Sequence, residues 1–335
     1  MKILSIEHND YEQVGINTTR HNGGGCFSRH AKELLNWAHD SFFVCGTEKT
    51  FDSISEKDNQ KSLIKISVEE MKRLNNYEPI SNIIKDSEQY DIVIHHRDNY
   101  AYNIQGLKAK QVYWSTFVNH TVHPENHGAL FYDPVNQKPI VYNTTKCYKV
   151  KIGTFVPRLF SKPEKENYIF VCTRHDATMN TNAILNLCIK NNVKCIVAGP
   201  ILDDYPLLID NKNTFYLGEV SNNLKNALSQ KAFLYSCIQN WDTIFSLSAI
   251  ESLAYGTPIV ARNRGCFKYV LKDEVNGFYF NENDDESKFL DIVEKAKNID
   301  SRKVWESAQE FSDTEMVKSF YGAFQHLLSS NKPQQ

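Results

Sequence analysis

The sequence predicts an α/β protein of two domains, each built around a parallel sheet. Predicted strands and helices alternate along the chain, which is typical of parallel sheets covered by helices on both faces. The length of 335 residues exceeds the size at which one hydrophobic core keeps growing, so two domains of about 150 to 200 residues are expected. Hydrophobic residues at 41% and aromatic residues at 12% are typical of ordinary globular domains.

Short apolar runs predict the strands of the first domain at Lys2 to Ile6, Phe42 to Cys45, Asp91 to His95 and Gln111 to Ser115. Apolar residues at helical spacing predict a helix between the first two strands, with Phe27, Ala31, Leu34, Leu35 and Ala38 on one face. The polar stretch from Glu48 to Tyr90 is predicted only as helix or loop.

A connection from Lys151 to Glu166, which contains Pro157 and Pro163, separates the first series of elements from a second one. The second series is predicted as strand Tyr168 to Cys172, a helix from Asn182 to Lys190, and strands Lys194 to Ala198, Thr214 to Leu217, Ala232 to Tyr235 and Ile259 to Ala261. A last helix covers Met316 to Leu328, and the tail from Ser329 to Gln335 is expected to be disordered. This order predicts two consecutive Rossmann-like domains.

Charge and cysteine usage narrow the class of protein. A formal net charge of −2 carries no electrostatic footprint for nucleic acid, so no nucleic-acid partner is expected. Glu7 interrupts the first apolar run and no apolar run of about 18 residues follows, so neither a signal peptide nor a spanning helix is predicted. Eight scattered cysteines without C-x-x-C favour reduced core residues in a cytoplasmic protein and argue against zinc. Peripheral membrane contact through Lys146, Lys149 and Lys151 stays open, although a solvated face is favoured.

The segment from Trp241 to Arg262, WDTIFSLSAIESLAYGTPIVAR, combines a polar loop, a helix start, a helix stop and a buried strand. Ser248 and Glu251 have the spacing of a capping box, in which side chains satisfy backbone N–H groups of the first turn. Gly256 and Pro258 predict the end of the helix. The segment therefore predicts a helix N-terminus at the carboxyl end of a sheet, where a diphosphate can be held.

From Phe245 to Ala261 this segment resembles the donor-binding motif of family 4 glycosyltransferases. The resemblance implies the GT-B architecture, in which two Rossmann-like domains have parallel sheets facing an interdomain cleft. It also implies that Glu251 hydrogen-bonds the ribose of a nucleotide sugar, a role compatible with helix capping. The family carboxylate near the donor hexose falls on Thr243, next to Asp242. Either Asp242 substitutes after a slip of one residue or the donor contacts differ.

Other segments extend the resemblance over the second half of the chain. Tyr168 to Arg174 is similar to a family strand whose arginine holds the donor diphosphate, although an arginine at a strand end is otherwise a surface residue. The family's lysine five residues later is Met179 here, and His175 is expected to substitute for it in part. Val197 to Pro200 and Tyr216 to Val220 are similar to segments that line the base pocket; simple strand-to-turn punctuation is the alternative.

In the first half, Gly24 and Gly25 occupy the place of a family glycine pair near the donor phosphate and the acceptor, and a plain loop is the alternative reading. Ser115 falls where many members have a histidine beside the reacting sugar, and His120 follows in the loop. The predicted catalytic residues are thus Ser115, His120 and Asp242. The predicted donor-binding residues are Gly24, Gly25, Arg174, Val220, Phe245, Ser246, Leu247, Ser248 and Glu251.

No D-x-D motif occurs, so the diphosphate charge is expected to be met by Arg174 and by backbone N–H groups at Ser246, Leu247 and Ser248. Neither a metal nor another cofactor is predicted. The resemblance implies an acceptor domain over residues 1–156, a donor domain over 157–313, and a C-terminal helix over 314–330 that crosses back to the first domain.

The expected function is that of a retaining glycosyltransferase. It moves a hexose from a nucleoside-diphosphate sugar, with GDP-mannose slightly favoured over UDP-glucose, to a glycan, glycoprotein or glycolipid acceptor. Two alternatives stay open: a nucleotide-sugar-binding subunit with weakened catalysis, and another GT-B enzyme such as a sugar-nucleotide epimerase. Whether the chain forms a homodimer is also open.

Overall fold

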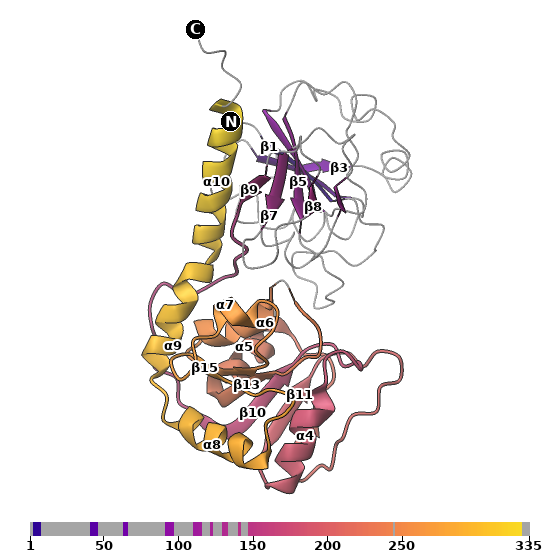
Figure 1. The fold of residues 1–335 in the computed structure, drawn as a ribbon, viewed down its shortest axis with the longest axis vertical. Coiled ribbons are helices and arrows are strands. Elements are labelled where there is room, and N and C mark those ends of the chain that lie inside the picture. Colours follow the sequence, from indigo (N-terminus) through magenta and orange to yellow (C-terminus); the bar gives the residue numbers. More distant parts are fainter. Residues whose placement is uncertain are drawn as a thin grey trace. The chain divides into compact units, whose positions relative to one another are not determined.

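The chain divides into two compact units in the computed structural model. The structure describes residues 3–7, 41–45, 63–65, 91–96, 110–115, 121–122, 129–132, 140–141, 147–243 and 245–329. Met1–Gly153 and Asp313–Gln335 make up the first unit, and Thr154–Ser312 make up the second. The sequence predicted boundaries after residues 156 and 313. Each unit is described by itself below (Figure 1).

The first unit contains a parallel sheet of order β3-β2-β1-β4-β5-β7-β9. The four predicted strands are present, each bound within one residue of the prediction, as β1 (Ile3–Glu7), β2 (Ser41–Cys45), β4 (Ile92–His96) and β5 (Lys110–Ser115). The sequence missed β3 (Leu63–Lys65), β6 (Thr121–Val122), β7 (Ala129–Tyr132), β8 (Ile140–Val141) and β9 (Cys147–Lys149). The helix predicted over 27–38 lies outside the described residues.

Helix α10 (Asp313–Ser329) belongs to the first unit and begins three residues before the predicted start at Met316. Its buried stripe includes Val317, Phe320 and Phe324, which confirms the apolar spacing found in the sequence. The helix contacts the segment around β9, because the Ser319 hydroxyl accepts a hydrogen bond of 2.8 Å from the backbone N–H of Lys151. Apolar burial and this bond together anchor the helix to its unit.

The second unit contains a parallel sheet of order β12-β11-β10-β13-β14-β15. Its strands are β10 (Glu166–Cys172), β11 (Cys195–Ala198), β12 (Thr214–Tyr216), β13 (Ala232–Cys237), β14 (Ile259–Ala261) and β15 (Gly277–Tyr279). Counted from β10 in chain order, this is the doubly wound order 3-2-1-4-5-6. The strand order reverses between β10 and β13, and ligands of such sheets bind outside the carboxyl ends of the strands at that reversal.

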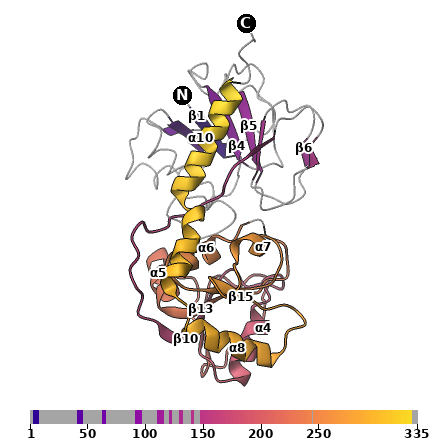
Figure 2. The same cartoon turned by 60° about the vertical axis from the view of Figure 1, so that its left-hand side comes forward.

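Helices cover both faces of the second sheet. Figures 1 and 2 show α5 (Asn222–Lys231) and α6 (Leu247–Ala254) on one face, with α4 (Thr181–Lys190) and α8 (Glu286–Lys297) on the other. Every residue of β13 and β14 is buried, as expected for strands that pack on both faces. The remaining helices are α7 (Phe267–Val270), α9 (Ser301–Ala308) and the 3-10 helix η5 (Gln309–Phe311).

The two ends of the second unit meet. The backbone N–H of Thr154 donates a 2.9 Å hydrogen bond to the carbonyl of Phe311, and the indole N–H of Trp305 donates one of 2.9 Å to the carbonyl of Pro157. The predicted helix stop is also confirmed: α6 ends at Ala254, and Gly256 has a φ of 72°. Among the described helices none is long and apolar enough to cross a membrane.

Candidate functional site

A pocket opens at the point where the strand order reverses. It lies at the carboxyl ends of β10 and β13 and at the starts of α4 and α6, where it is lined by Val171, Thr173, Met179, Thr181, Ile184, Tyr235, Ser236, Cys237, Ile238, Gln239, Ser246 and Ser248. The hydroxyl of Ser236 is buried there without a hydrogen-bond partner among the described residues. Because an unpaired buried hydroxyl costs stability, a water or ligand in the pocket would be stabilised by this group.

The loops after β10, β11 and β12 approach one another very closely. Gly199 has a φ of 121°, and a Cβ atom there would lie 1.8 Å from the carbonyl oxygen of Thr173. Its N–H donates a 2.8 Å bond to the carbonyl of Gly218, and its own carbonyl accepts a 2.8 Å bond from the Tyr216 hydroxyl. The segments Val197 to Pro200 and Tyr216 to Val220, singled out in the sequence, are therefore neighbours, and Val220 is half-buried.

Helix α6 begins at the pocket, but not with the predicted cap. Ser246 is the N-cap residue, and its side chain makes no capping hydrogen bond. The predicted Ser248–Glu251 capping box is wrong, because Ser248 already lies inside the helix. Phe245, Ser246, Leu247 and Ser248 are half-buried at this start, where first-turn N–H groups have no partner within the helix. The N-terminus can thus hold an anion.

Glu251 lies one turn further along α6 and faces a partner on another helix. Its side chain is 8% exposed, and its Oε2 is 2.7 Å from Nζ of Lys225 on α5. The Thr154 hydroxyl is 3.5 Å from its Oε1. Lys225 is the functional neighbour that sequence reasoning missed. No local pattern connects it with Glu251, because the two residues are 26 positions apart on different helices.

Arg174 follows β10 directly and is partly exposed. Its Nε donates a 2.7 Å bond to Asp176, and its guanidinium carbon lies 5.7 Å from the centre of the Trp241 ring. His175 differs from the expectation. It is fully buried, its ring nitrogens lie 3.1 Å from the Thr181 hydroxyl and 3.0 Å from the Ala198 carbonyl, and burial lowers its pKa. A neutral, enclosed ring cannot replace a lysine charge, so that prediction is wrong.

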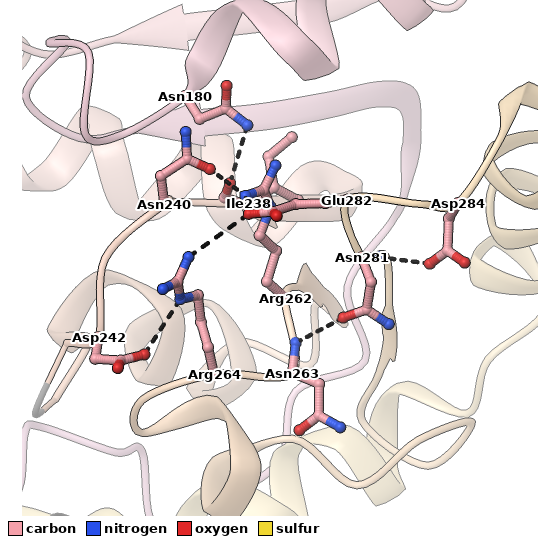
Figure 3. A network of polar contacts seen from close by, with 10 residues as sticks. All are labelled: Asn180, Ile238, Asn240, Asp242, Arg262, Asn263, Arg264, Asn281, Glu282 and Asp284. Atoms are coloured by element: carbon pink, nitrogen blue, oxygen red, sulfur yellow. Dashed lines mark hydrogen bonds and ion pairs between the residues drawn. The ribbon is translucent and has the colours of Figure 1, made fainter.

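The loop after β13 turns Asp242 outward and Thr243 inward. The Asp242 side chain is 60% exposed, whereas Thr243 is 5% exposed. The Asp242 Oδ1 accepts a 3.2 Å bond from Nε of Arg264, which follows β14. Figure 3 shows this contact at one end of a network that also joins Arg262 and Glu282. Of the two candidate positions for a family-type carboxylate, only Asp242 has an exposed side chain.

Residues predicted in the first unit are only partly described. Ser115 is the last residue of β5, at the carboxyl edge of the first sheet, where β4 also ends. His120, Gly24 and Gly25 lie outside the described residues. Within the described ranges, no three His, Cys, Asp or Glu side chains are grouped so that they could hold a metal ion.

Comparisons with known proteins agree with this geometry. Residues 157–312 match the family model described as Glycosyl transferases group 1, which identifies the second unit as a domain of that kind. No curated protein sequence matches the chain.

Solved structures extend the likeness to the whole chain. A glycosyltransferase from Rickettsia africae is 14% identical with a TM-score of 0.71, and each chain is covered to 99%. HepE from Anabaena in complex with UDP is 12% identical with a TM-score of 0.69, covering 97% of this chain and 100% of that one. Sucrose-phosphate synthase from Thermosynechococcus elongatus is 10% identical with a TM-score of 0.68, covering 99% and 100%. The α/β fold with GT-B architecture is thereby confirmed.

Proposed function

We propose that the protein is a retaining glycosyltransferase that transfers a hexose from a nucleoside-diphosphate sugar to a carbohydrate, glycoprotein or lipid-linked acceptor. The observation that carries the proposal is the pocket between β10 and β13, bordered by the N-terminus of α6 and close to Arg174. Open α/β sheets bind nucleotides at this position, and helix N-termini bind phosphate. The family match of residues 157–312 supports the same conclusion.

In the proposed complex, Arg174 and the first N–H groups of α6 bind the diphosphate. Their positive charge stabilises the leaving group as the glycosidic bond breaks, which is the main contribution expected of a site without a covalent nucleophile. The retaining course corresponds to attack from the face that the diphosphate leaves, with a diphosphate oxygen accepting the acceptor's proton. Glu251 is proposed to hydrogen-bond the ribose; its carboxylate has acceptor capacity beyond the bond to Lys225.

Donor identity is part of the proposal. The sequence slightly favours GDP-mannose, while the complex of HepE with UDP supports UDP-glucose as the second donor to test. Isothermal titration with GDP-mannose, UDP-glucose, GDP and UDP, each with and without magnesium, separates these donors. We expect metal-independent binding of one nucleotide family. If none of the four ligands binds to the folded protein, the proposed function is excluded.

Arg174→Ala tests the diphosphate contact. Loss of a guanidinium that pairs with phosphate is expected to weaken binding of the nucleoside diphosphate by about tenfold or more, and to leave binding of the nucleoside nearly unchanged. Titration with both ligands checks this. Equal losses for the two ligands would contradict the role of Arg174.

A nucleotide-sugar-binding subunit is the second candidate function. It is favoured by Thr243, Met179 and Ser115, which stand where the family has a carboxylate, a lysine and a histidine. The two candidates differ in product formation. A transferase releases free nucleoside diphosphate from a bound nucleotide sugar, by transfer to an acceptor or by slow hydrolysis, whereas a binding subunit leaves the nucleotide sugar intact.

A further inference from the structure

The loop after β13 presents two adjacent residues outward beside the pocket. Gln239 and Ser246 both line the pocket, and Trp241 and Asp242 lie between them in the chain. Trp241 is 39% exposed, although a large aromatic side chain is normally covered, and the side chain of Asp242 is 60% exposed. An exposed indole next to an exposed carboxylate is a combination suited to a sugar, which has an apolar C–H face and a rim of hydroxyl groups.

We propose that Trp241 stacks against the sugar ring of the bound donor and that Asp242 accepts hydrogen bonds from its hydroxyl groups. This inference rests on the proposed function, because it assigns the sugar end of the same donor. The hexose of a nucleotide sugar is bonded directly to the diphosphate. Arg174, the proposed diphosphate contact, lies 5.7 Å from the Trp241 ring, so the sugar that follows the diphosphate lies next to the indole.

The backbone of the loop is held in one orientation. The carbonyl of Thr243 accepts a 2.8 Å hydrogen bond from the N–H of Cys266, and the Thr243 hydroxyl lies 3.3 Å from the carbonyl of Phe245. A Cβ atom on Gly265 would lie 2.7 Å from the backbone N and O of Thr243, so these two loops are in direct contact. With Thr243 fixed inward, its neighbour Asp242 is fixed outward.

Arginines hold both proposed sugar contacts. The Arg174 guanidinium lies over the Trp241 ring, and Nε of Arg264 donates to Asp242. Arg264 is itself oriented by Glu282, whose Oε1 lies 3.7 Å from its Nη1 and also pairs with Arg262 (Figure 3). Arg264 is therefore a positioning residue for Asp242. Preorganised contacts bind a ligand more tightly because less freedom is lost on binding.

The test compares binding of a nucleotide sugar with binding of its nucleoside diphosphate. The probes are UDP-glucose with UDP and GDP-mannose with GDP, titrated into the full chain. Trp241→Ala is expected to weaken nucleotide-sugar binding about fivefold to tenfold and Asp242→Asn about tenfold, with nucleoside diphosphate binding unchanged within about twofold. Trp241→Phe keeps an aromatic face and is expected to recover most of the loss.

Positioning is tested by combining variants. Arg264→Gln should weaken nucleotide-sugar binding, and Asp242→Asn combined with Arg264→Gln should be no weaker than Asp242→Asn alone, since the two residues act through one contact. Arg302→Gln is the matched control. Arg302 also covers an aromatic ring, that of Phe160 at 4.9 Å, but it lies outside the loops that follow the strands, and its variant should bind both ligands normally.

The outcomes separate this inference from the proposed function. If the natural sequence binds neither nucleotide family, both fail. If it binds a nucleotide sugar but Trp241→Ala and Asp242→Asn, folded as judged by their thermal unfolding, shift the sugar and the nucleotide equally or shift neither, only this inference fails. A selective loss for the nucleotide sugar, with recovery in Trp241→Phe, supports it.

Discussion

At the scale of single residues, the pair Lys225–Glu251 has the largest energetic consequence. Both side chains are about nine-tenths buried, and their charged atoms are 2.7 Å apart. Removing one partner of such a pair leaves the other charge buried without compensation, which typically costs about 3 to 5 kcal/mol. Replacing both by apolar residues of similar size is often neutral. The pair therefore specifies how α5 and α6 meet more than it adds net stability.

This pair leads to a prediction for unfolding by denaturant. Lys225→Met and Glu251→Leu are each expected to lower the free energy of unfolding by about 3 kcal/mol or more, and the double variant to lose far less than the sum. Urea titrations of the four proteins measure the coupling. Additive losses would show that the two side chains do not interact in solution.

Lys165 is a second buried charge, but without an acidic partner among its recorded contacts. Its Nζ donates to the Gln230 carbonyl at 3.0 Å and to the Thr257 hydroxyl, and burial lowers its pKa to about 7. The unfolded chain retains this proton up to its ordinary pKa of 10.5. Between pH 7 and 10.5 the unfolded state therefore binds more protons than the folded state, so the stability contributed by this site rises with pH.

The prediction for Lys165 concerns a difference between two pH profiles. The unfolding free energy of the natural sequence minus that of Lys165→Gln should rise between pH 7 and 9, by at most about 1.4 kcal/mol per pH unit. Chemical denaturation at several pH values measures this difference. Lys190→Gln, at an exposed position on α4, is the control. Parallel profiles for the natural sequence and Lys165→Gln would contradict the predicted shift.

At the scale of elements, the contact between Gly199 and Thr173 decides how the ends of β10 and β11 meet. A side chain at Gly199 meets both a steric clash and a positive φ, whereas Gly218 has a φ of 71° and open space around its missing Cβ. Gly199→Ala is expected to cost at least about 3 kcal/mol of stability and Gly218→Ala only about 1 kcal/mol. Thermal unfolding of both variants checks the order, and equal losses would refute it.

The start of α6 illustrates a limit of local patterns. The spacing of Ser248 and Glu251 satisfied the rule for a capping box, but the helix begins after Ser246 and the glutamate pairs with Lys225. A buried ammonium is a stronger partner for a carboxylate than a backbone N–H that other groups can reach. Competition from another element therefore overrode a local preference.

At the scale of the whole molecule, the second unit is continuous in sequence while the first consists of two segments. Thr154 and Ser312, the ends of the second unit, form a parallel bridge. The second unit also has its own hydrophobic core, which includes Ile169, Leu234 and Ile292. A continuous chain with a closed core and adjacent ends has the properties of an independently folding domain.

We therefore expect a fragment of residues 154–312 to fold alone. It should unfold in one cooperative thermal transition and retain the helix and strand content of the second unit, as circular dichroism measures. A shorter fragment that starts at residue 161 lacks buried Val156 and the Pro157 carbonyl that binds Trp305, and should be less stable. A fragment 154–312 without a cooperative transition would show that the unit depends on the rest of the chain.

The sequence by itself determined the α/β class, most strands of the second sheet and the end of α6. Apolar periodicity, glycine and proline act over a few neighbouring residues, so these features can be read locally. Short strands such as β15 were missed because three residues carry little pattern. Only the tertiary structure decided that Glu251 pairs with Lys225, that Asp242 faces outward while Thr243 faces inward, and that Gly199 lies against Thr173. Each of these depends on packing between segments far apart in the chain, which no local pattern encodes.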